Sequence, residues 1–313
     1  MIYESNFHTV DRRDIEFLFP ALPDRINKGD MGRVLCICGS YEKNGSAMSG
    51  AAYFSASAAY KCGAGIVEIF THRKNYESLA SLVPEAVFSL YDTEIEDANS
   101  ISERLRSEIK KADSIVLGCG LGKSELAKAL VKTTLDNADC PLVIDADGLN
   151  ILAENKELQE LVRARKNDTV ITPHPGEMSR LSGIPIPKIL ADTDGIAVSL
   201  AKNLKITVLL KDHETVITDG DYTFKNQSGN AGMASAGMGD VLSGIIGAML
   251  AHSRVSDDIS QERFALPFTL YRTATAAYIH GLSGDRARDE LCEYSITASD
   301  VLKAIPRVLR PQK

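Results

Sequence analysis

The feature of this sequence that most constrains its fold is a regular alternation between short apolar runs and longer segments of helical composition. Each apolar run is bounded by glycine or polar residues, which is typical of a buried strand. Strands that alternate with helices form a mostly parallel sheet with helices on both faces. The sequence therefore predicts an α/β fold. The runs predicted as strands are 34–38, 66–70, 87–91, 114–117, 141–144, 169–171 and 207–210.

Helical segments fill the intervals between these strands. Helices are predicted at 11–18, 46–62, 75–82, 101–111 and 123–135. Further helices are predicted between the strand at 141–144 and residue 165, and two more between the strands at 169–171 and 207–210. The last predicted helices are at 265–281 and 298–308. Strands at 216–218 and 222–225 are expected to form a hairpin around Asp219 and Gly220. No flexible linker divides the 313 residues, so we expect a single domain over 1–313 with an N-terminal arm at 1–27.

Glycine or polar residues follow strand after strand, at the point where each strand ends. These residues are Gly39, Gly118, Asp145, Thr172 and Lys211. Open α/β sheets bind their ligands at the carboxyl ends of the strands. We therefore expect the functional site at this edge of the sheet.

The segment 226–251 joins a glycine-rich stretch to an apolar run at 241–250. Glycine allows positive φ and close approach of backbone to a ligand. The apolar run is too short to span a bilayer and is predicted to be a buried helix. A loop that opens onto a helix N-terminus presents free N–H groups and partial positive charge, which suits an anion such as phosphate.

Asp240 stands at the junction of the glycine-rich stretch and the apolar run. Taken alone, it would be interpreted as an ordinary helix cap. With Gly237 and Gly239 before it and Gly229 and Gly232 upstream, a functional role is favoured, either as general base or in holding a cation. A place in the first helical turn predicts an ionised carboxylate, because the helix dipole favours that form.

Other strand-end residues have two interpretations each. His174 lies between two prolines, which fix its backbone, and both a structural and a functional role stay open. Asp145 and Asp147 are expected by default to cap the following helix, with a place near Mg²⁺ or the substrate as the alternative. Glu177 is a further candidate for a helix cap.

Composition and missing motifs exclude several classes of function. The net charge is −7 and no Lys/Arg cluster stands out, so nucleic acid and membranes are not expected as partners. The glycines at 118–122 lack the full dinucleotide spacing, and no P-loop, nucleophile elbow or zinc motif occurs. The six cysteines, at 36, 38, 62, 119, 140 and 292, are expected to be reduced and mostly buried in a cytoplasmic protein, with no metal ligands among them.

Taken together, these residues resemble the ADP- or ATP-dependent NAD(P)H-hydrate dehydratases of the ribokinase-like superfamily. The resemblance runs in order from about Lys28 to Pro306. It implies a three-layer sandwich with a mostly parallel central sheet. The matching motifs are KGDMGRVLCICGS, GAAYFSASAAYKCGAGIV, GCGLG, VIDADGLN, TPHPGE, LLKDHETVI, NQSGNAGMASAGMGDVLSGIIGAMLA and ASDVLKAIP.

The resemblance implies a repair reaction on hydrated NADH or NADPH. The nucleotide phosphorylates the C6 hydroxyl of the hydrated ring, and phosphate then leaves as the ring double bond returns. Asp240 would be the base, and Mg²⁺ would bridge the phosphates of ADP or ATP without a dedicated protein metal site. The implied substrate contacts are Ala51, Gly120, His174 and Asp240. The implied nucleotide contacts are Lys211, Asp212, His213, Glu214, Thr215 and Gly239, and the anion hole is Ala236, Gly237, Met238 and Gly239.

Two residues depart from the family pattern: Asp212 replaces the usual Gly, and Met238 replaces the usual Thr. An acid at 212 is expected to weaken or alter nucleotide binding, whereas backbone N–H groups survive the change at 238. The arm at 1–27 is too short for the epimerase domain to which this family is often fused, so action on the S epimer alone is expected. The resemblance also implies a homo-oligomer, a tetramer. A small-molecule kinase of the same superfamily and a non-catalytic nucleotide sensor are the alternatives.

Overall fold

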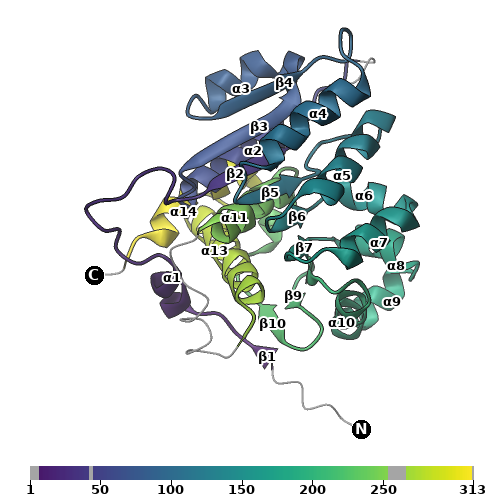
Figure 1. Cartoon of the computed structure of the whole chain (residues 1–313). Coiled ribbons are helices and arrows are strands. Elements are labelled where there is room, and N and C mark those ends of the chain that lie inside the picture. Colours follow the sequence, from purple (N-terminus) through teal and green to yellow (C-terminus); the bar gives the residue numbers. More distant parts are fainter. Residues whose placement is uncertain (1–6, 42–44, 253–265, 312–313) are drawn as a thin grey trace.

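A ten-stranded mixed sheet forms the centre of the computed structural model, which describes residues 7–41, 45–252 and 266–311 (Figure 1). Neighbouring strands run parallel except at β8–β9 and β9–β10, so the predictions of a mostly parallel sheet and of a hairpin at 216–225 are confirmed. In sheet order the strands are β1 (Phe7–His8), β10 (Thr223–Asn226), β9 (Thr215–Thr218), β8 (Thr207–Leu210), β7 (Thr169–Ile171), β6 (Leu142–Ile144), β5 (Ser114–Leu117), β2 (Arg33–Ile37), β3 (Ile66–His72) and β4 (Val87–Tyr91).

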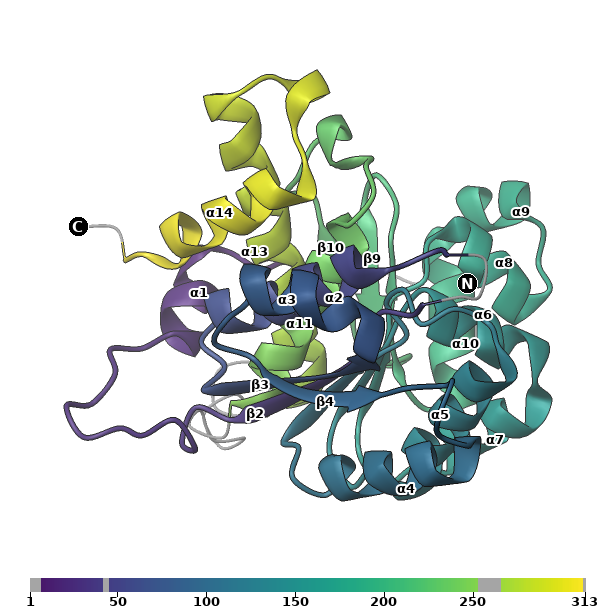
Figure 2. The ribbon, with the colours of Figure 1, turned by 90° about the horizontal axis from the view of Figure 1, so that it is seen from above.

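Helices cover both faces of the sheet, which gives three layers (Figure 2). One face carries α1 (Arg12–Leu18), α2 (Ser49–Lys61), α3 (Tyr76–Leu82), α11 (Met238–Ala251), α13 (Phe268–Glu290) and α14 (Ala298–Leu309). The other face carries α4 (Ala98–Ile109), α5 (Glu125–Asn137), α6 (Asp147–Glu154), α7 (Lys156–Ala164), α8 (Pro175–Ser182), α9 (Ile186–Ala191) and α10 (Thr193–Leu204).

The central strands are apolar throughout because both of their faces are covered. Side chains alternate between the faces of a strand. Val34 and Cys36 of β2 accordingly enter the core beneath α2 and α11, whereas Leu35 and Ile37 enter the core beneath α4 and α5. All four side chains are fully buried, as expected for a central parallel strand.

Helix α11 packs closely at the centre of its layer because it carries glycine at its contact points. A Cβ atom at Gly244 would lie 2.2 Å from the carbonyl oxygen of Ser55 in α2, and one at Gly247 would lie 2.5 Å from Val116 in β5. Both distances are too short for any side chain. The small residues within the apolar run therefore let α11 lie against both its neighbouring helix and the sheet.

Two predicted helical regions were wrong in detail. Three helices, α8, α9 and α10, separate β7 from β8 instead of two, because Gly183 ends α8 in a left-handed conformation and Asp192 caps α10. Helix α13 continues to Glu290 instead of stopping at Gly281. That glycine faces Ser228, whose backbone leaves no room for a Cβ atom, so it serves close packing rather than termination. The predicted start of this helix at 265 lies outside the described residues.

The arm before β2 confirms the predicted short helix. Asp11 caps α1, and Ile15 and Leu18 are buried against the core. Strand β1 was not predicted, and it pairs with β10 through Phe7 and Thr223. The residues before Phe7 lie outside the described part of the chain.

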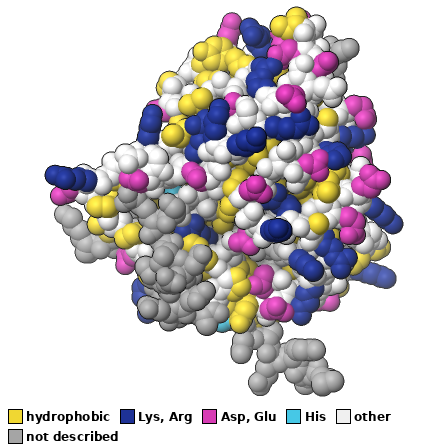
Figure 3. All heavy atoms as spheres, in the orientation of Figure 1, with side chains coloured by type: hydrophobic (Ala, Val, Ile, Leu, Met, Phe, Trp, Pro, Cys, Tyr) yellow, Lys and Arg dark blue, Asp and Glu magenta, His cyan; other side chains and the backbone are white. Residues whose placement is uncertain are grey.

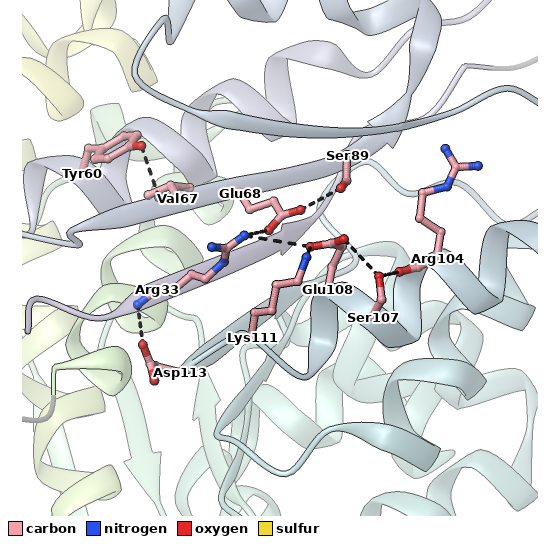
Figure 4. Close-up of polar contacts among 10 residues, drawn as sticks. All are labelled: Arg33, Tyr60, Val67, Glu68, Ser89, Arg104, Ser107, Glu108, Lys111 and Asp113. Atoms are coloured by element: carbon pink, nitrogen blue, oxygen red, sulfur yellow. Dashed lines mark hydrogen bonds and ion pairs between the residues drawn. The ribbon is translucent and has the colours of Figure 1, made fainter. Parts of the chain in front are cut away.

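A partly buried charged cluster lies near the amino ends of β2 and β5 (Figure 4). Arg33 pairs with Glu68 of β3, which is 1% exposed and also accepts a hydrogen bond from Ser89 (2.7 Å). Glu108 of α4 pairs with Lys111 and lies 3.9 Å from the Arg33 guanidinium. Hereafter these four side chains, Arg33, Glu68, Glu108 and Lys111, are called the base cluster.

The outer surface carries both signs of charge. On the face seen in Figure 3, Lys and Arg side chains are interspersed with Asp and Glu. Among the described helices, none is both long and apolar enough to cross a membrane.

Candidate functional site

The carboxyl ends of five adjacent parallel strands meet at one edge of the sheet. These strands are β2, β5, β6, β7 and β8. The loops that follow them touch one another: Gly39 donates its N–H to the carbonyl of Cys119 (2.9 Å), and Lys211 donates its N–H to that of Pro173 (2.8 Å). The predicted gathering of strand-end residues at this edge is confirmed.

A buried ion pair lies at the centre of this edge. Asp145 follows β6 and is 1% exposed; its Oδ1 accepts from Lys211 Nζ (2.9 Å) and its Oδ2 from Ser243 Oγ of α11 (2.8 Å). Burial disfavours its charge, but Lys211 and these hydrogen bonds hold the pKa of Asp145 below its usual value. Burial also opposes the charge of Lys211, yet Asp145 and Glu177 keep the pKa of that ammonium raised.

The default interpretation of Asp145 and Asp147 as helix caps was wrong. The N-cap of α6 is Ala146, and no side chain caps that helix. Asp145 is turned instead toward Lys211, and Asp147 Oδ2 accepts from the N–H of Gly122 (2.8 Å) in the glycine loop after β5. Both carboxylates therefore join strand-end loops to one another.

His174 and Glu177 form a capping box at the start of α8. His174 Nδ1 accepts from the N–H of Gly176 (2.9 Å), and Glu177 Oε2 accepts from the N–H of His174 (2.9 Å). The expected capping role of Glu177 is thus confirmed, and its carboxylate also lies 3.9 Å from Lys211 Nζ. Burial, with Lys211 and Arg180, lowers the pKa of His174, so its imidazole is neutral at pH 7.

The glycine-rich segment opens onto the N-terminus of α11 as predicted. Gly237 is the N-cap and has φ of 89°, and a Cβ atom there would lie 2.7 Å from the Phe54 ring, so only glycine fits. A Cβ atom at Gly239 would lie 3.3 Å from both Asp145 Oδ2 and Lys211 Nζ. The first turn of α11, with N–H groups that lack partners within the helix, therefore rests on the buried ion pair.

Asp240 is the third residue of α11 and is not its cap, because the cap is Gly237 and no side chain caps the helix. Burial, reinforced by the charge of Asp145, raises the pKa of Asp240 to about 6, while Cys119 and Lys211 act in the opposite direction. The predicted carboxylate at neutral pH still holds, because a pKa of about 6 leaves Asp240 mostly ionised at pH 7. Asp240 still ionises below pH 7, and a carboxylate with a pKa near neutrality suits proton transfer.

Gly120 and Ala51 come together beside this centre. Gly120 has φ of 61°, and a Cβ atom there would lie 2.8 Å from Cβ of Ala51 in the first turn of α2. Helix α2 in turn contacts the residue predicted as the base, since Ser55 Oγ donates to the backbone carbonyl of Asp240 (3.2 Å). Two predicted substrate contacts and the predicted base thus border one region.

The loop after Lys211 leads away from the buried pair. Asp212 and His213 are exposed, and Thr215 Oγ1 donates to the carbonyl of Asp212 (3.3 Å). Glu214 accepts from Gln227 at the start of the glycine-rich segment (2.9 Å). Of this predicted nucleotide loop, the structure brings Lys211 to the buried centre and leaves Asp212 and His213 at the surface.

Sequence reasoning missed two residues of this centre: Ser243, which donates to Asp145, and Ser55, which donates to the Asp240 carbonyl. Ser243 had a usable signal, because it follows Asp240 by three positions and so shares its face of α11. Ser55 had none, because it reaches Asp240 from a distant segment of the chain.

Comparisons with known proteins identify a family that shares this sequence pattern. Residues 34–307 match the family model described as NAD(P)H-hydrate dehydratase. The bifunctional NAD(P)H-hydrate repair enzyme Nnr of Coxiella burnetii is 34% identical over 316 residues, covering 98% of this chain and 58% of that protein. The ADP-dependent (S)-NAD(P)H-hydrate dehydratase of Neisseria meningitidis is 35% identical over 237 residues, covering 75% of this chain and 74% of that protein. The chain spans about half the length of the bifunctional relatives.

Solved structures share the fold. A ribokinase-like superfamily protein from Enterococcus faecalis matches with a TM-score of 0.80 at 26% identity, covering 99% of this chain and 97% of that one. The ADP/ATP-dependent NAD(P)H-hydrate dehydratase of Bacillus subtilis, co-crystallised with ATP and Mg²⁺, matches with a TM-score of 0.77 at 24% identity, covering 97% and 98%. The predicted ribokinase-like three-layer sandwich is confirmed.

Proposed function

Because the chain belongs to the NAD(P)H-hydrate dehydratase family, we propose that it restores NADH or NADPH from the S epimer of the hydrated cofactor, with ADP or ATP as phosphoryl donor. The observation that carries this proposal is Asp240: a largely buried carboxylate with a pKa of about 6, in the first turn of an apolar helix, beside Asp145 and Lys211. Such a group accepts protons where a helix N-terminus stabilises negative charge.

The proposed reaction has two steps. In the first, Asp240 accepts the proton of the C6 hydroxyl while that oxygen bonds to the terminal phosphorus of the nucleotide and the phosphoanhydride bond breaks. The N–H groups of Ala236 to Gly239 stabilise the charge on the transferring phosphoryl group. In the second step the C6–O bond breaks and phosphate leaves with the bonding pair. A proton then leaves the neighbouring ring carbon as the double bond returns.

Lys211 and the loop up to Thr215 are the proposed nucleotide contacts. Lys211 already lies against the first turn of α11, since a Cβ atom at Gly239 would be 3.3 Å from its Nζ. An ammonium in that place stabilises phosphate charge that arrives at the helix N-terminus. Ala51, Gly120 and His174 are the proposed contacts of the hydrated dinucleotide.

Mg²⁺ is proposed to arrive with the nucleotide. It keeps several waters in phosphoryl-transfer sites and takes one or two carboxylates together with phosphate oxygens. Glu177 fits this requirement, because its buried carboxylate accepts one backbone hydrogen bond and lies at the same strand edge, 3.9 Å from Lys211. When bound, the ion neutralises phosphate charge during transfer.

The test is a direct assay of the purified protein. It receives separated S and R hydrates of NADH with Mg²⁺ and either ADP or ATP, at low temperature to slow epimerisation, and NADH absorbance is followed. Recovery of NADH from the S form alone is expected. A stable phosphate ester without NADH would indicate the small-molecule kinase instead, and nucleotide binding without turnover would indicate the sensor. The same runs compare ADP with ATP, and hydrated NADH with hydrated NADPH.

The homotetramer stays a prediction from the family resemblance, and the cytoplasmic location stays a prediction from the pattern of cysteines. Light scattering coupled to size-exclusion chromatography measures the first, and fractionation of the source cells measures the second. A monomer with full dehydratase activity would show that the site needs no partner subunit.

A further inference from the structure

The glycine-rich segment between β10 and α11 lies along the second half of α13. A Cβ atom at Gly281 would lie 2.5 Å from the carbonyl oxygen of Ser228, and one at Gly284 would lie 2.1 Å from Met233 Sδ. Neither distance leaves room for a side chain, so the two glycines let the helix and the segment touch. They are three positions apart on α13 and therefore share one face of the helix. The segment rests on this face.

Asp285 follows these glycines on α13 and binds the segment with both of its carboxylate oxygens. Its Oδ2 accepts from the N–H of Gly229 (2.9 Å), and its Oδ1 accepts from Asn230 Nδ2 (3.1 Å). Asn230 Oδ1 accepts in turn from the N–H of Gly232 (3.1 Å), so the amide of Asn230 is used at both ends. Hydrogen bonds to a carboxylate are stronger than those between neutral groups. Asp285 therefore anchors two consecutive residues of the segment to α13.

Short turns connect this anchor to the proposed anion hole. Directly after Asn230 the chain forms the short helix η2 (Ala231–Met233), and the N–H of Ser235 then donates to the carbonyl of Met233 (2.9 Å). The next residue, Ala236, is the first of the proposed anion hole. Because the intervening chain is short and closed by its own hydrogen bonds, a displacement at the anchor would also displace the anion hole.

We propose that Asp285 is a positioning residue for the anion hole: its carboxylate holds the glycine-rich segment on α13 and thereby sets the position of the N–H groups of residues 236–239. The inference rests on the proposed function, in which those groups stabilise the transferring phosphoryl group. A misplacement of about 1 Å, caused by a change far from the chemistry, can cost about 10²-fold in rate. These N–H groups act mainly on charge that develops in the transition state, so the loss should fall on kcat more than on nucleotide affinity.

The test compares kcat for hydrated NADH with the Kd for ADP in two variants of the whole protein, both assayed well below their melting temperatures. Asp285→Ala removes both hydrogen bonds and should lower kcat by about 10- to 100-fold, with the Kd for ADP changed by less than about threefold. Asp285→Asn keeps one acceptor oxygen but turns an NH₂ group toward one of the two donors. Its kcat should therefore lie between those of the wild type and Asp285→Ala.

Asp289→Ala is the matched control, because Asp289 is exposed one turn further along α13 and pairs with Arg288 (3.2 Å), which also lies 3.4 Å from Asp285. This variant removes a carboxylate beside Arg288 and leaves the anchor of the segment intact, so its kcat should equal that of the wild type. Wild-type kcat in folded Asp285→Ala would overturn the inference. An equal loss in Asp289→Ala, or a loss of nucleotide affinity as large as the loss of kcat, would also overturn it. If Asp285→Ala fails to fold, wild-type kcat in Asp285→Asn has the same meaning.

Hydrogen–deuterium exchange tests the anchor without turnover. Peptides that cover residues 228–239 should exchange at least about tenfold faster in Asp285→Ala than in the wild type or Asp289→Ala, because the N–H of Gly229 loses its acceptor and the segment opens more often. Exchange in β2 should stay the same. Equal exchange of the segment in all three proteins would overturn the inference even if the wild type is an active dehydratase. A wild type without hydrate turnover would instead overturn the proposed function, and the exchange comparison would still decide whether Asp285 holds the segment.

Discussion

Two groups of charges lie near opposite ends of the sheet's parallel strands, and they are balanced differently. The base cluster of Arg33, Glu68, Glu108 and Lys111 sets two carboxylates against two cations (Figure 4). At the carboxyl ends, Lys211 Nζ lies 2.9 Å from Asp145 and 3.9 Å from Glu177, and its charge also acts on Asp240. The three carboxylates with Lys211 are hereafter called the strand-end cluster.

The difference appears in the pKa values. In the base cluster burial disfavours the charge of Glu108, but Lys111 and its hydrogen-bond partners still lower its pKa. In the strand-end cluster burial, reinforced by the charge of Asp145, raises the pKa of Glu177 and of Asp240, and Lys211 only partly opposes this. A carboxylate that only stabilises the fold is paired with a cation. A carboxylate with too few neighbouring cations can instead accept a proton or bind a cation that arrives with a ligand.

The largest expected effect comes from removing the unpaired carboxylate. Asp240→Asn keeps the shape of the side chain but cannot accept the hydroxyl proton. Turnover should fall by about 10²–10⁴-fold, the usual contribution of a general base, while nucleotide affinity changes little. Steady-state kinetics on hydrated NADH and a nucleotide titration measure the two quantities. Turnover equal to the wild type would remove Asp240 from the chemistry.

Breaking each ion pair at its cation compares the two clusters directly. Arg33→Met leaves the carboxylate of Glu68, 1% exposed, without its cation. We expect a loss of about 3 kcal/mol in the free energy of unfolding with kcat nearly unchanged. Lys211→Met likewise leaves the carboxylate of Asp145 without its cation, and it should reduce both the free energy of unfolding and turnover. Urea unfolding and kinetics on both variants provide the measurement.

The double variant Arg33→Met/Glu68→Gln is the control for that comparison. This variant removes the unpaired carboxylate charge of Glu68 together with Arg33, so most of the lost free energy of unfolding should return. A large fall in kcat for fully folded Arg33→Met would contradict the interpretation that the base cluster only stabilises the fold.

The same Asp240→Asn change should stabilise the fold in a pH-dependent manner. The folded-state pKa of about 6 lies above the unfolded value, so the wild type loses stability as pH rises from about 4 to 6. Asn has no charge to bury, and should therefore be more stable by about 2–3 kcal/mol at pH 7.5. The advantage should shrink toward pH 4.5. An equal difference at both pH values in urea unfolding would show that the charge is not its source.

The smallest effect is expected at Asp212, next to Lys211 but on the surface. Its side chain is exposed, and its carbonyl accepts from Thr215 Oγ1 (3.3 Å). Water screens an exposed charge, so Asp212→Gly should leave the Kd for ADP unchanged or tighten it by a few-fold. Calorimetric titration measures this Kd. A marked loss of affinity would mean that Asp212 makes a favourable contact with the bound nucleotide.

Much of the architecture followed from local patterns. The strands at 87–91, 114–117, 169–171 and 207–210 were predicted with the bounds that the structure has. The last three are fully buried, and a buried parallel strand needs a continuous apolar run. The errors arose where one residue type has two uses. Gly183 ends a helix, whereas Gly281 lies inside one and serves close packing, and the sequence pattern did not separate these cases.

The sequence alone determined that strand-end loops would carry the site, that 226–251 would open onto a helix N-terminus, and that Asp240 would stand in its first turn. These features are local, because strand direction and glycine conformation are set by near neighbours in the chain. Only the tertiary structure decided that Asp145 would bind Lys211 rather than cap a helix, and that Ser55 of α2 would bind the backbone carbonyl of Asp240. It alone also set the pKa of Asp240, because burial and charges from distant strands fix a buried pKa, and no local pattern records them.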